Sequence, residues 1–246
     1  MEVNKFLLVC EGPTDIIILK EIATRLSEQY GKKAEIIEMS PQLDATSGSY
    51  PSHGWVEVKN WCKRFSTKSK EEIENMPVWA RKILEKSNWR AFLAINNAKA
   101  LIIQLDTDIV NQINDLDESF ENSSLTRKEY ANTAMMKWLG EDTVPGNLYF
   151  VLSTYSSETW LLAVHDRNNS IFDDLEANFN YEEIDNVEQR LIQLGYKKKI
   201  FRGKEKLSKS KKDYSHYVQD IITNLEKVKV DVHEAKNYCD FIESKI

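Results

Sequence analysis

Short apolar runs alternate with stretches of helical periodicity over most of the chain. Four runs have the length and the branched side chains of buried strands, namely Lys5–Cys10, Ala34–Met39, Ala100–Asp108 and Asn147–Ser153. Helical patterns follow three of them, at about Thr14–Tyr30, Arg127–Leu139 and Ser157–Val164. This order predicts an α/β fold in which a mostly parallel, Rossmann-like central sheet is flanked by helices and joined by right-handed crossovers.

Residues 41–97 interrupt this alternation. Pro41–Gly54 is rich in Ser, Gly and Pro and predicts a loop, whereas Lys59–Arg90 has a helical pattern. Four of the six tryptophans lie in the interruption, at positions 55, 61, 79 and 89. We therefore expect a helical insertion, and we expect its tryptophans to form a small core of its own.

The last third of the chain has a different character. Asp173–Gln193 is acidic and predicts a helix, and Tyr214–Ile246 predicts one or two closing helices. Between them, Lys197–Lys212 predicts an exposed loop or a short helix. The expected organisation is a core over residues 1–165, with the insertion at about 41–97, and a helical C-terminal extension over residues 166–246.

Charge is distributed unevenly along the chain. The net charge is −6, yet Lys197–Lys212 holds nine Lys or Arg residues and one acid, Glu205, so that this segment is +8 and the remainder is −14. A basic island on an acidic protein favours a polyanionic partner such as nucleic acid. Phosphate contacts are expected from its lysines, in particular Lys204, Lys206, Lys209, Lys211 and Lys212.

The composition indicates the cellular compartment in which such a protein acts. With 41% hydrophobic residues the chain can bury a core, and no apolar run approaches the roughly 20 residues of a membrane span. The three cysteines, Cys10, Cys62 and Cys239, form no Cys-x-x-Cys pair, which is typical of reduced thiols. A cytoplasmic protein without membrane contact is expected.

Acidic residues follow two of the predicted strands. Glu11 comes after the first apolar run, and Asp106 and Asp108 end a later one. In an extended strand, Asp106 and Asp108 share one face. Because the carboxyl ends of parallel strands meet at one edge of a sheet, these acids are expected to converge. Paired carboxylates of this kind are suitable ligands for Mg²⁺ or Mn²⁺.

The spacing of these acids resembles the Toprim domain. The stretch CEGPTD is similar to its glutamate motif, and QLDTD is similar to its Asp-x-Asp motif. The separation between the two is longer than in a minimal Toprim domain, which the insertion at 41–97 explains. The resemblance covers roughly residues 1–165.

A third stretch extends the resemblance to stand-alone Toprim nucleases of the OLD-like and RloB-like groups. Ser156, Glu158 and Trp160 match a Ser-x-Glu-x-Trp pattern that follows the Asp-x-Asp strand in those proteins. Such proteins commonly act in bacterial anti-phage or mobile-element systems with an ATPase. This chain has no Gly-x-x-x-x-Gly-Lys-[Ser/Thr] loop, so the ATPase would be a separate protein. Homo-oligomers remain possible.

The resemblance implies a role for each acid. Asp106 and Asp108, helped by Glu158 or Glu11, would hold one or two Mg²⁺ or Mn²⁺ ions for phosphodiester hydrolysis of RNA or DNA. Glu11 is the general acid or base of that family pattern.

Asp15, or its neighbour Thr14, is expected to cap the first helix. His165, seven residues after Glu158, would lie two helical turns along the same face and contact substrate.

Two other functions remain open. The sequence around Asp106 also resembles the nucleophile motif of haloacid-dehalogenase phosphatases, with Asp106 as nucleophile and Asp108 as acid or base. That motif usually opens its domain, and it leaves CEGPTD without a role. A non-catalytic subunit that binds or senses nucleic acid is the second alternative.

Overall fold

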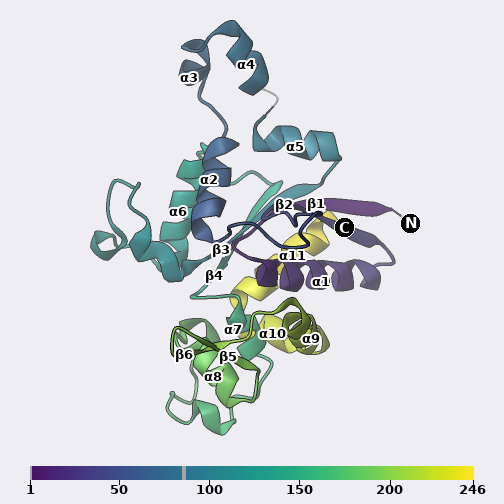
Figure 1. Cartoon of the computed structure of the whole chain (residues 1–246), viewed down its shortest axis with the longest axis vertical. Helices are drawn as coiled ribbons and strands as arrows, with labels where there is room; N and C mark the ends of the chain where they lie inside the picture. The colour runs from purple at the N-terminus through teal and green to yellow at the C-terminus, as the bar shows by residue number, and fades with distance from the viewer. Residues whose placement is uncertain (1, 85–86) are drawn as a thin grey trace.

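A wholly parallel sheet of four strands forms the centre of the computed structural model, which describes residues 2–84 and 87–246 (Figure 1). The strand order is β2-β1-β3-β4. The strands are β1 (Val3–Val9), β2 (Lys33–Ser40), β3 (Ala100–Asp106) and β4 (Leu148–Ser153). The α/β class and the four predicted strands are therefore confirmed, and β3 ends at Asp106, two residues earlier than expected.

The register places the ends of three strands side by side. β1 pairs with β3 so that Val9 lies opposite Ile103, and β3 pairs with β4 so that Asp106 lies opposite Ser153. The residues that follow β1, β3 and β4 therefore emerge at the same edge of the sheet. This edge is where open parallel sheets usually bind ligands.

Each face of the sheet is covered by helices, because alternate strand residues point to opposite sides. On one face, Phe6, Leu8 and Ile102 pack with α1 (Pro13–Gln29), α9 (Lys211–Thr223) and α11 (His233–Lys245). On the other, Leu7, Val9 and Ile103 pack with α2 (Trp55–Arg64), α5 (Trp89–Asn96) and α6 (Arg127–Leu139). Figure 1 shows α1 and α11 on the opposite side of the sheet from α2 and α6.

Local signals set the ends of the helices. α6 has the predicted bounds, because Thr126 and Glu129 form a capping box at its start and Gly140, with φ +66°, ends it. α1 begins after Gly12 with Pro13 in its first turn and no side-chain cap. The expectation that Thr14 or Asp15 caps α1 is wrong, since both side chains are buried inside the first turn.

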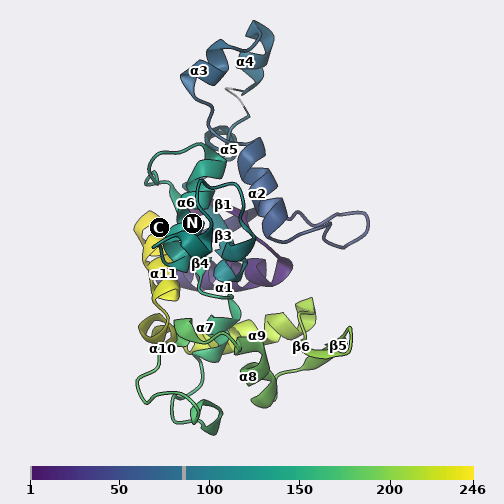
Figure 2. The ribbon, with the colours of Figure 1, turned by 90° about the vertical axis from the view of Figure 1, so that its left-hand side faces the viewer.

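The interruption at 41–97 holds four helices where one helical stretch was predicted. They are α2, α3 (Lys70–Glu74), α4 (Val78–Leu84) and α5; residues 85 and 86 of the predicted stretch lie outside the described residues. α3 and α4 project away from the sheet in both views (Figures 1 and 2). The tryptophans do not form a separate core: Trp61 and Trp89 pack in the core of the sheet, while Trp79 is 70% exposed.

The C-terminal region contains less helix near its start than predicted. Its closing helical stretch is divided into more helices than predicted. Between α7 (Glu158–Leu162) and α8 (Val187–Gln193) the chain forms short 3₁₀ turns at Ser170–Phe172 and Tyr181–Glu183. Three helices, α9, α10 (Leu225–Asp231) and α11, replace the predicted one or two. No helix in the described part of the chain has the length and apolar character to cross a bilayer.

The basic segment forms a β-hairpin. β5 (Lys198–Phe201) pairs antiparallel with β6 (Lys204–Leu207), and Figure 2 shows the pair beside α8 and α9. Arg202 and Gly203 form the two-residue turn with φ +50° and +75°. Positive φ at both turn residues suits the twist of a tight hairpin, which explains why this polar segment is ordered as strands.

Candidate functional site

Glu11 and Asp106 meet at the edge of the sheet. The Asp106 backbone N–H donates a hydrogen bond of 2.7 Å to Glu11 Oε1. In return, the Glu11 backbone N–H donates to Gln104 Oε1 at 3.0 Å, and Gln104 Nε2 donates to Asp106 Oδ1 at 2.8 Å. The convergence expected from the sequence therefore occurs, and the strand register of β1 and β3 produces it.

Gln104 was missed by sequence reasoning. Its side chain is 1% exposed and its amide bridges the ends of β1 and β3. The available signal was a single amide within an otherwise apolar strand, where burial without partners would be costly. Gln104 fixes the orientation of the Asp106 carboxylate relative to Glu11.

Asp108 does not extend the strand. The backbone after Asp106 turns into a 3₁₀ helix, Thr107–Gln112, so the expectation that Asp106 and Asp108 share a strand face is wrong. Asp108 is instead the solvent-exposed acid of the site. Partial burial raises the pKa of its carboxyl group, while Lys209 and Arg127 oppose that shift.

Asp15 also belongs to this site. Its carboxylate is 5% exposed and accepts a hydrogen bond of 2.6 Å from Ser157 Oγ, at the N-terminus of α7. This contact ties α1 to the segment after β4. Ser157 occupies the N-cap position but uses its hydroxyl for Asp15, so it makes no side-chain cap.

Glu158 is the first residue of α7 and is 1% exposed. Its Oε1 lies 2.6 Å from Lys209 Nζ and also accepts a hydrogen bond from the Tyr214 hydroxyl. Lys209 reaches Glu188 Oε1 as well, at 3.3 Å. Glu158 therefore binds a lysine of the basic segment, a contact that the sequence did not predict.

Crowding of these acids changes their protonation. Burial and the charges of Asp15 and Asp108 raise the pKa of Glu11 to about 8, against a hydrogen bond from Asp106 that lowers it. Burial and the charge of Glu158 raise the pKa of Asp15 to about 6. Burial, Asp15 and Glu11 raise the pKa of Asp106 well above its usual range. Carboxyl groups in such surroundings resist ionisation unless a cation compensates them.

Lys209 is a cation that acts on all five acids. Its charge lowers the pKa of the carboxyl groups in this cluster, which are Glu11, Asp15, Asp106, Asp108 and Glu158. For Glu158 the ion pair and hydrogen bonds from Lys209 and Tyr214 outweigh burial, and the pKa of this carboxyl lies below its ordinary value. The pKa of Lys209 is raised in turn, because the neighbouring carboxylates outweigh the effect of burial.

The other lysines that were predicted to contact phosphate lie on the hairpin or close to it in the chain. Lys204, Lys211 and Lys212 are exposed, and Lys206 lies 3.7 Å from Glu188 Oε2. Lys206 also lines a hollow of about 190 Å³ together with Asp108 and Tyr155. Through Lys206, the hairpin therefore reaches the exposed side of the acidic cluster, where Asp108 lies.

His165 lies outside the expected helix. α7 ends at Leu162, so His165 cannot continue two turns along its face. Its Nε2 lies 3.1 Å from the Tyr196 hydroxyl, and burial lowers the pKa of its imidazole. The charged groups that act on it are Asp220 and Lys227, which do not belong to the acidic cluster. Its contact with substrate stays a prediction.

The donors of the cluster suit a hard divalent cation in part. Within residues 2–84 and 87–246, no three His, Cys, Asp or Glu side chains are placed to hold a metal together. Mg²⁺, however, is often bound by one or two carboxylates, waters and substrate phosphate. Asp106 and Asp108 supply carboxylate oxygens of that kind. Burial raises the pKa of both carboxyl groups, and the charges of neighbouring acids add to that rise.

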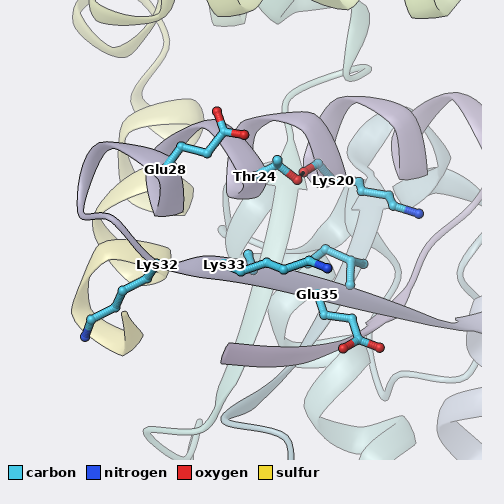
Figure 3. Close-up of a pocket in the computed structure, with 8 residues that line it drawn as sticks. Lys20, Thr24, Glu28, Lys32, Lys33 and Glu35 are labelled. Carbon is cyan, nitrogen blue, oxygen red and sulfur yellow. Dashed lines mark hydrogen bonds between the residues drawn. The ribbon is translucent and has the colours of Figure 1, made fainter. Parts of the chain in front are cut away.

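A larger hollow lies elsewhere in the described structure. It measures about 540 Å³ and is formed by α1 and the edge strand β2, with Lys20, Thr24 and Glu35 among its lining (Figure 3). None of the predicted site residues lines it. Its side chains carry both signs of charge and, in Figure 3, do not converge on one point.

Comparisons with known proteins leave the chain without an assigned family. No family model, curated protein or solved structure matches it. Its functional interpretation therefore rests on the residues and the geometry described above.

Proposed function

We propose that this chain is a metal-dependent nuclease of the Toprim type, which hydrolyses phosphodiester bonds of RNA or DNA with a separate ATPase as partner. One observation carries the proposal. The Glu11 carboxylate is hydrogen bonded to the backbone of Asp106, so the acids of the two sequence motifs form one cluster at the ends of β1 and β3.

Glu11 has the properties of a proton carrier. With a pKa of about 8, its carboxyl group is present in both protonation states near neutral pH. The hydrogen bond from Asp106 holds Glu11 Oε1 in place and leaves Oε2 to exchange a proton with water or with a leaving oxygen.

Asp106 and Asp108 would hold the metal. When bound, Mg²⁺ or Mn²⁺ supplies polarisation of the scissile phosphate and a more acidic water. Gln104 orients the Asp106 carboxylate, and the exposed position of Asp108 leaves it open to both cation and substrate. Lys206, beside Asp108 in the 190 Å³ hollow, would contact a phosphate that enters there.

The proposal is tested with the purified full chain on tRNA, single-stranded DNA, duplex DNA and p-nitrophenyl phosphate, with and without Mg²⁺ or Mn²⁺. Cleavage of nucleic acid should fall by about 10²-fold or more in Glu11→Gln and Asp106→Asn. Asp142→Asn, an exposed acid away from the cluster, is the matched control. Phosphatase activity with a phosphoryl group trapped on Asp106 would overturn the proposal.

Metal binding has a readout that is independent of cleavage. Mg²⁺ or Mn²⁺ that binds the folded chain raises its melting temperature. This rise should be lost in the double variant Asp106→Asn, Asp108→Asn and kept in Asp142→Asn. An equal rise in all three proteins would remove the metal from the proposal.

A second function is favoured by the Lys209–Glu158 ion pair. Because Lys209 pairs with Glu158 and lowers the pKa of the other acids in the cluster, the chain could bind nucleic acid without metal or cleavage. Tight binding with no cleavage, both alone and with an added ATPase partner, would identify this binding function.

A further inference from the structure

The two faces of the β5–β6 hairpin differ in chemistry. Residues that are directly opposite in an antiparallel pair share a face. Lys199 lies opposite Lys206, and Phe201 lies opposite Lys204. One face therefore carries three lysines and one aromatic ring, with no acid.

The other face is attached to the rest of the molecule at one residue, Leu207. It carries Lys198, Ile200, Glu205 and Leu207, since Lys198 lies opposite Leu207 and Ile200 opposite Glu205. Lys198 and Glu205 form an ion pair, and Leu207 is fully buried in the core. The hairpin is thus anchored at its base through Leu207. On the cationic face, Lys206 lies close to Glu188, whereas Lys199, Phe201 and Lys204 are exposed.

The exposed aromatic of the cationic face has a guanidinium beside it. Phe201 is 54% exposed, and Arg202 Cζ lies 5.3 Å from the centroid of its ring. An exposed phenyl ring gains little from water, but nucleic-acid bases stack on such rings and on guanidinium planes.

The same pairing recurs at the acidic cluster. Arg127 Cζ lies 4.9 Å from the ring centroid of Tyr155, the second residue after β4. Tyr155 has φ +61°, a conformation that is costly for a residue with a side chain and that frequently occurs at functional sites. Tyr155 is half-buried and borders two hollows, of about 190 and 390 Å³.

Lys206 connects the two aromatic–arginine pairs. It belongs to the cationic face of the hairpin, and it also lines the smaller hollow with Asp108 and Tyr155. A nucleic-acid strand lying along the hairpin past Phe201 and Lys206 would therefore reach Asp108 and then Tyr155.

From this arrangement we propose that the ligand is a single-stranded nucleic acid whose unpaired bases stack on Phe201 and Tyr155. This inference rests on the proposed function and specifies its substrate class. Duplexes present no base faces, so their binding gains from the lysines but not from the rings. The lysines hold the phosphates, and the two rings place the strand across the acidic cluster.

The test measures binding in EDTA, where no metal-dependent cleavage can occur. A short fluorescein-labelled oligonucleotide of mixed sequence, as DNA and as RNA, is compared by anisotropy with its duplex and with heparin, a polyanion without bases. Phe201→Ala and Tyr155→Gly should each weaken single-strand binding about tenfold and change duplex and heparin binding little. Phe201→Tyr and Tyr155→Phe keep a ring and should bind like the natural chain.

Ile95→Ala controls for the loss of an exposed apolar side chain, since Ile95 is 73% exposed on α5. Equal affinity for single strand and duplex overturns the inference, as does unchanged binding in both ring-free variants. Equal losses for the oligonucleotide and heparin also overturn it, because the rings would then not be contacting bases. Retained single-strand binding with no cleavage under any metal condition would refute the nuclease and leave this inference standing.

Discussion

Lys209 Nζ lies 2.6 Å from Glu158 Oε1. This ion pair joins two parts of the chain for which the sequence predicted different functions. Glu158 was expected to bind metal, and Lys209 was expected to bind phosphate. Lys209 follows β6 by two residues and precedes α9, so this ion pair also fixes the base of the basic hairpin against the acidic cluster.

Lys209→Met should destabilise the protein. The substitution keeps much of the aliphatic chain but leaves the buried Glu158 carboxylate without its cation, at a cost of about 1–3 kcal/mol. Urea unfolding at neutral pH measures the loss. The loss should shrink on acidification, because the pKa of Glu158 is held low by Lys209 and a protonated Glu158 needs no partner.

Lys209→Arg and Lys211→Met are the matched controls for this effect. Arginine retains the charge, and Lys211 is exposed on the neighbouring helix, so both variants should remain within about 0.5 kcal/mol of the natural chain. A loss at Lys209→Met that does not vary with pH would contradict the electrostatic explanation.

Glu11 should make the folded state less stable as pH rises. Its pKa is about 8 in the fold against 4.5 for a free side chain, so the folded chain binds more protons between these values. This contribution to stability is full at low pH and is lost as pH increases toward 8. Glu11→Gln keeps an oxygen that accepts the Asp106 N–H, and it should flatten the fall in melting temperature over that window.

The control for the Glu11 prediction is Asp142→Asn, which should follow the natural pH curve. A Glu11→Gln curve parallel to that of the natural chain would show that Glu11 titrates normally. Metal added at the alkaline end should recover part of the lost stability if Asp106 and Asp108 bind it.

Asp15 should influence the pH dependence of catalysis through Glu11. Its charge contributes to the raised pKa of Glu11, so Asp15→Asn should lower that pKa. Asparagine can still accept the hydrogen bond from Ser157. In a profile of kcat/KM against pH, the limb near pH 8 should move to lower pH, whereas an unmoved limb would exclude coupling between the two groups.

Gly140 is required where α6 ends. It has φ +66°, and an added Cβ would lie 2.2 Å from the backbone oxygen of Thr67. Gly140→Ala should cost about 1–3 kcal/mol, or more if the Thr67 segment cannot shift. Thermal unfolding measures this loss as a lower melting temperature.

Two other glycines separate the causes of that loss. Gly195 has φ +93° with nothing within 4 Å of an added Cβ, and Gly146 has open space without a positive φ. Gly195→Ala should show the backbone cost alone, and Gly146→Ala should be close to neutral. A loss at Gly140→Ala no larger than that at Gly195→Ala would argue against the contact with Thr67.

The exposed lysines near the hairpin should set the salt dependence of nucleic-acid binding. Lys204, Lys211 and Lys212 are exposed. Replacing each by Gln should reduce the slope of log affinity against log salt by about 0.7 for single strands. Lys33→Gln, on the edge strand β2, is the control, and an equal change there would indicate nonspecific attraction to the whole surface.

The sequence by itself determined the strands of the central sheet and the glycine at which α6 ends. Runs such as Leu101–Ile103 are apolar on both faces, so they must be covered on both sides, and Gly140 can end a helix by local backbone preference. The meeting of Glu11 with Asp106 followed from the same logic, because parallel strands gather their carboxyl ends.

Only the tertiary structure decided which partners the polar groups take. The pairings of Asp15 with Ser157 and of Glu158 with Lys209 join residues 142 and 51 positions apart, a separation that no periodic pattern encodes. The basic segment became a hairpin because Leu207 could be buried and the Arg202–Gly203 turn could close, although its many lysines alone favoured a loop. Local pattern fixes where apolar side chains go, whereas the partners of buried charges depend on which distant segments the fold brings into contact.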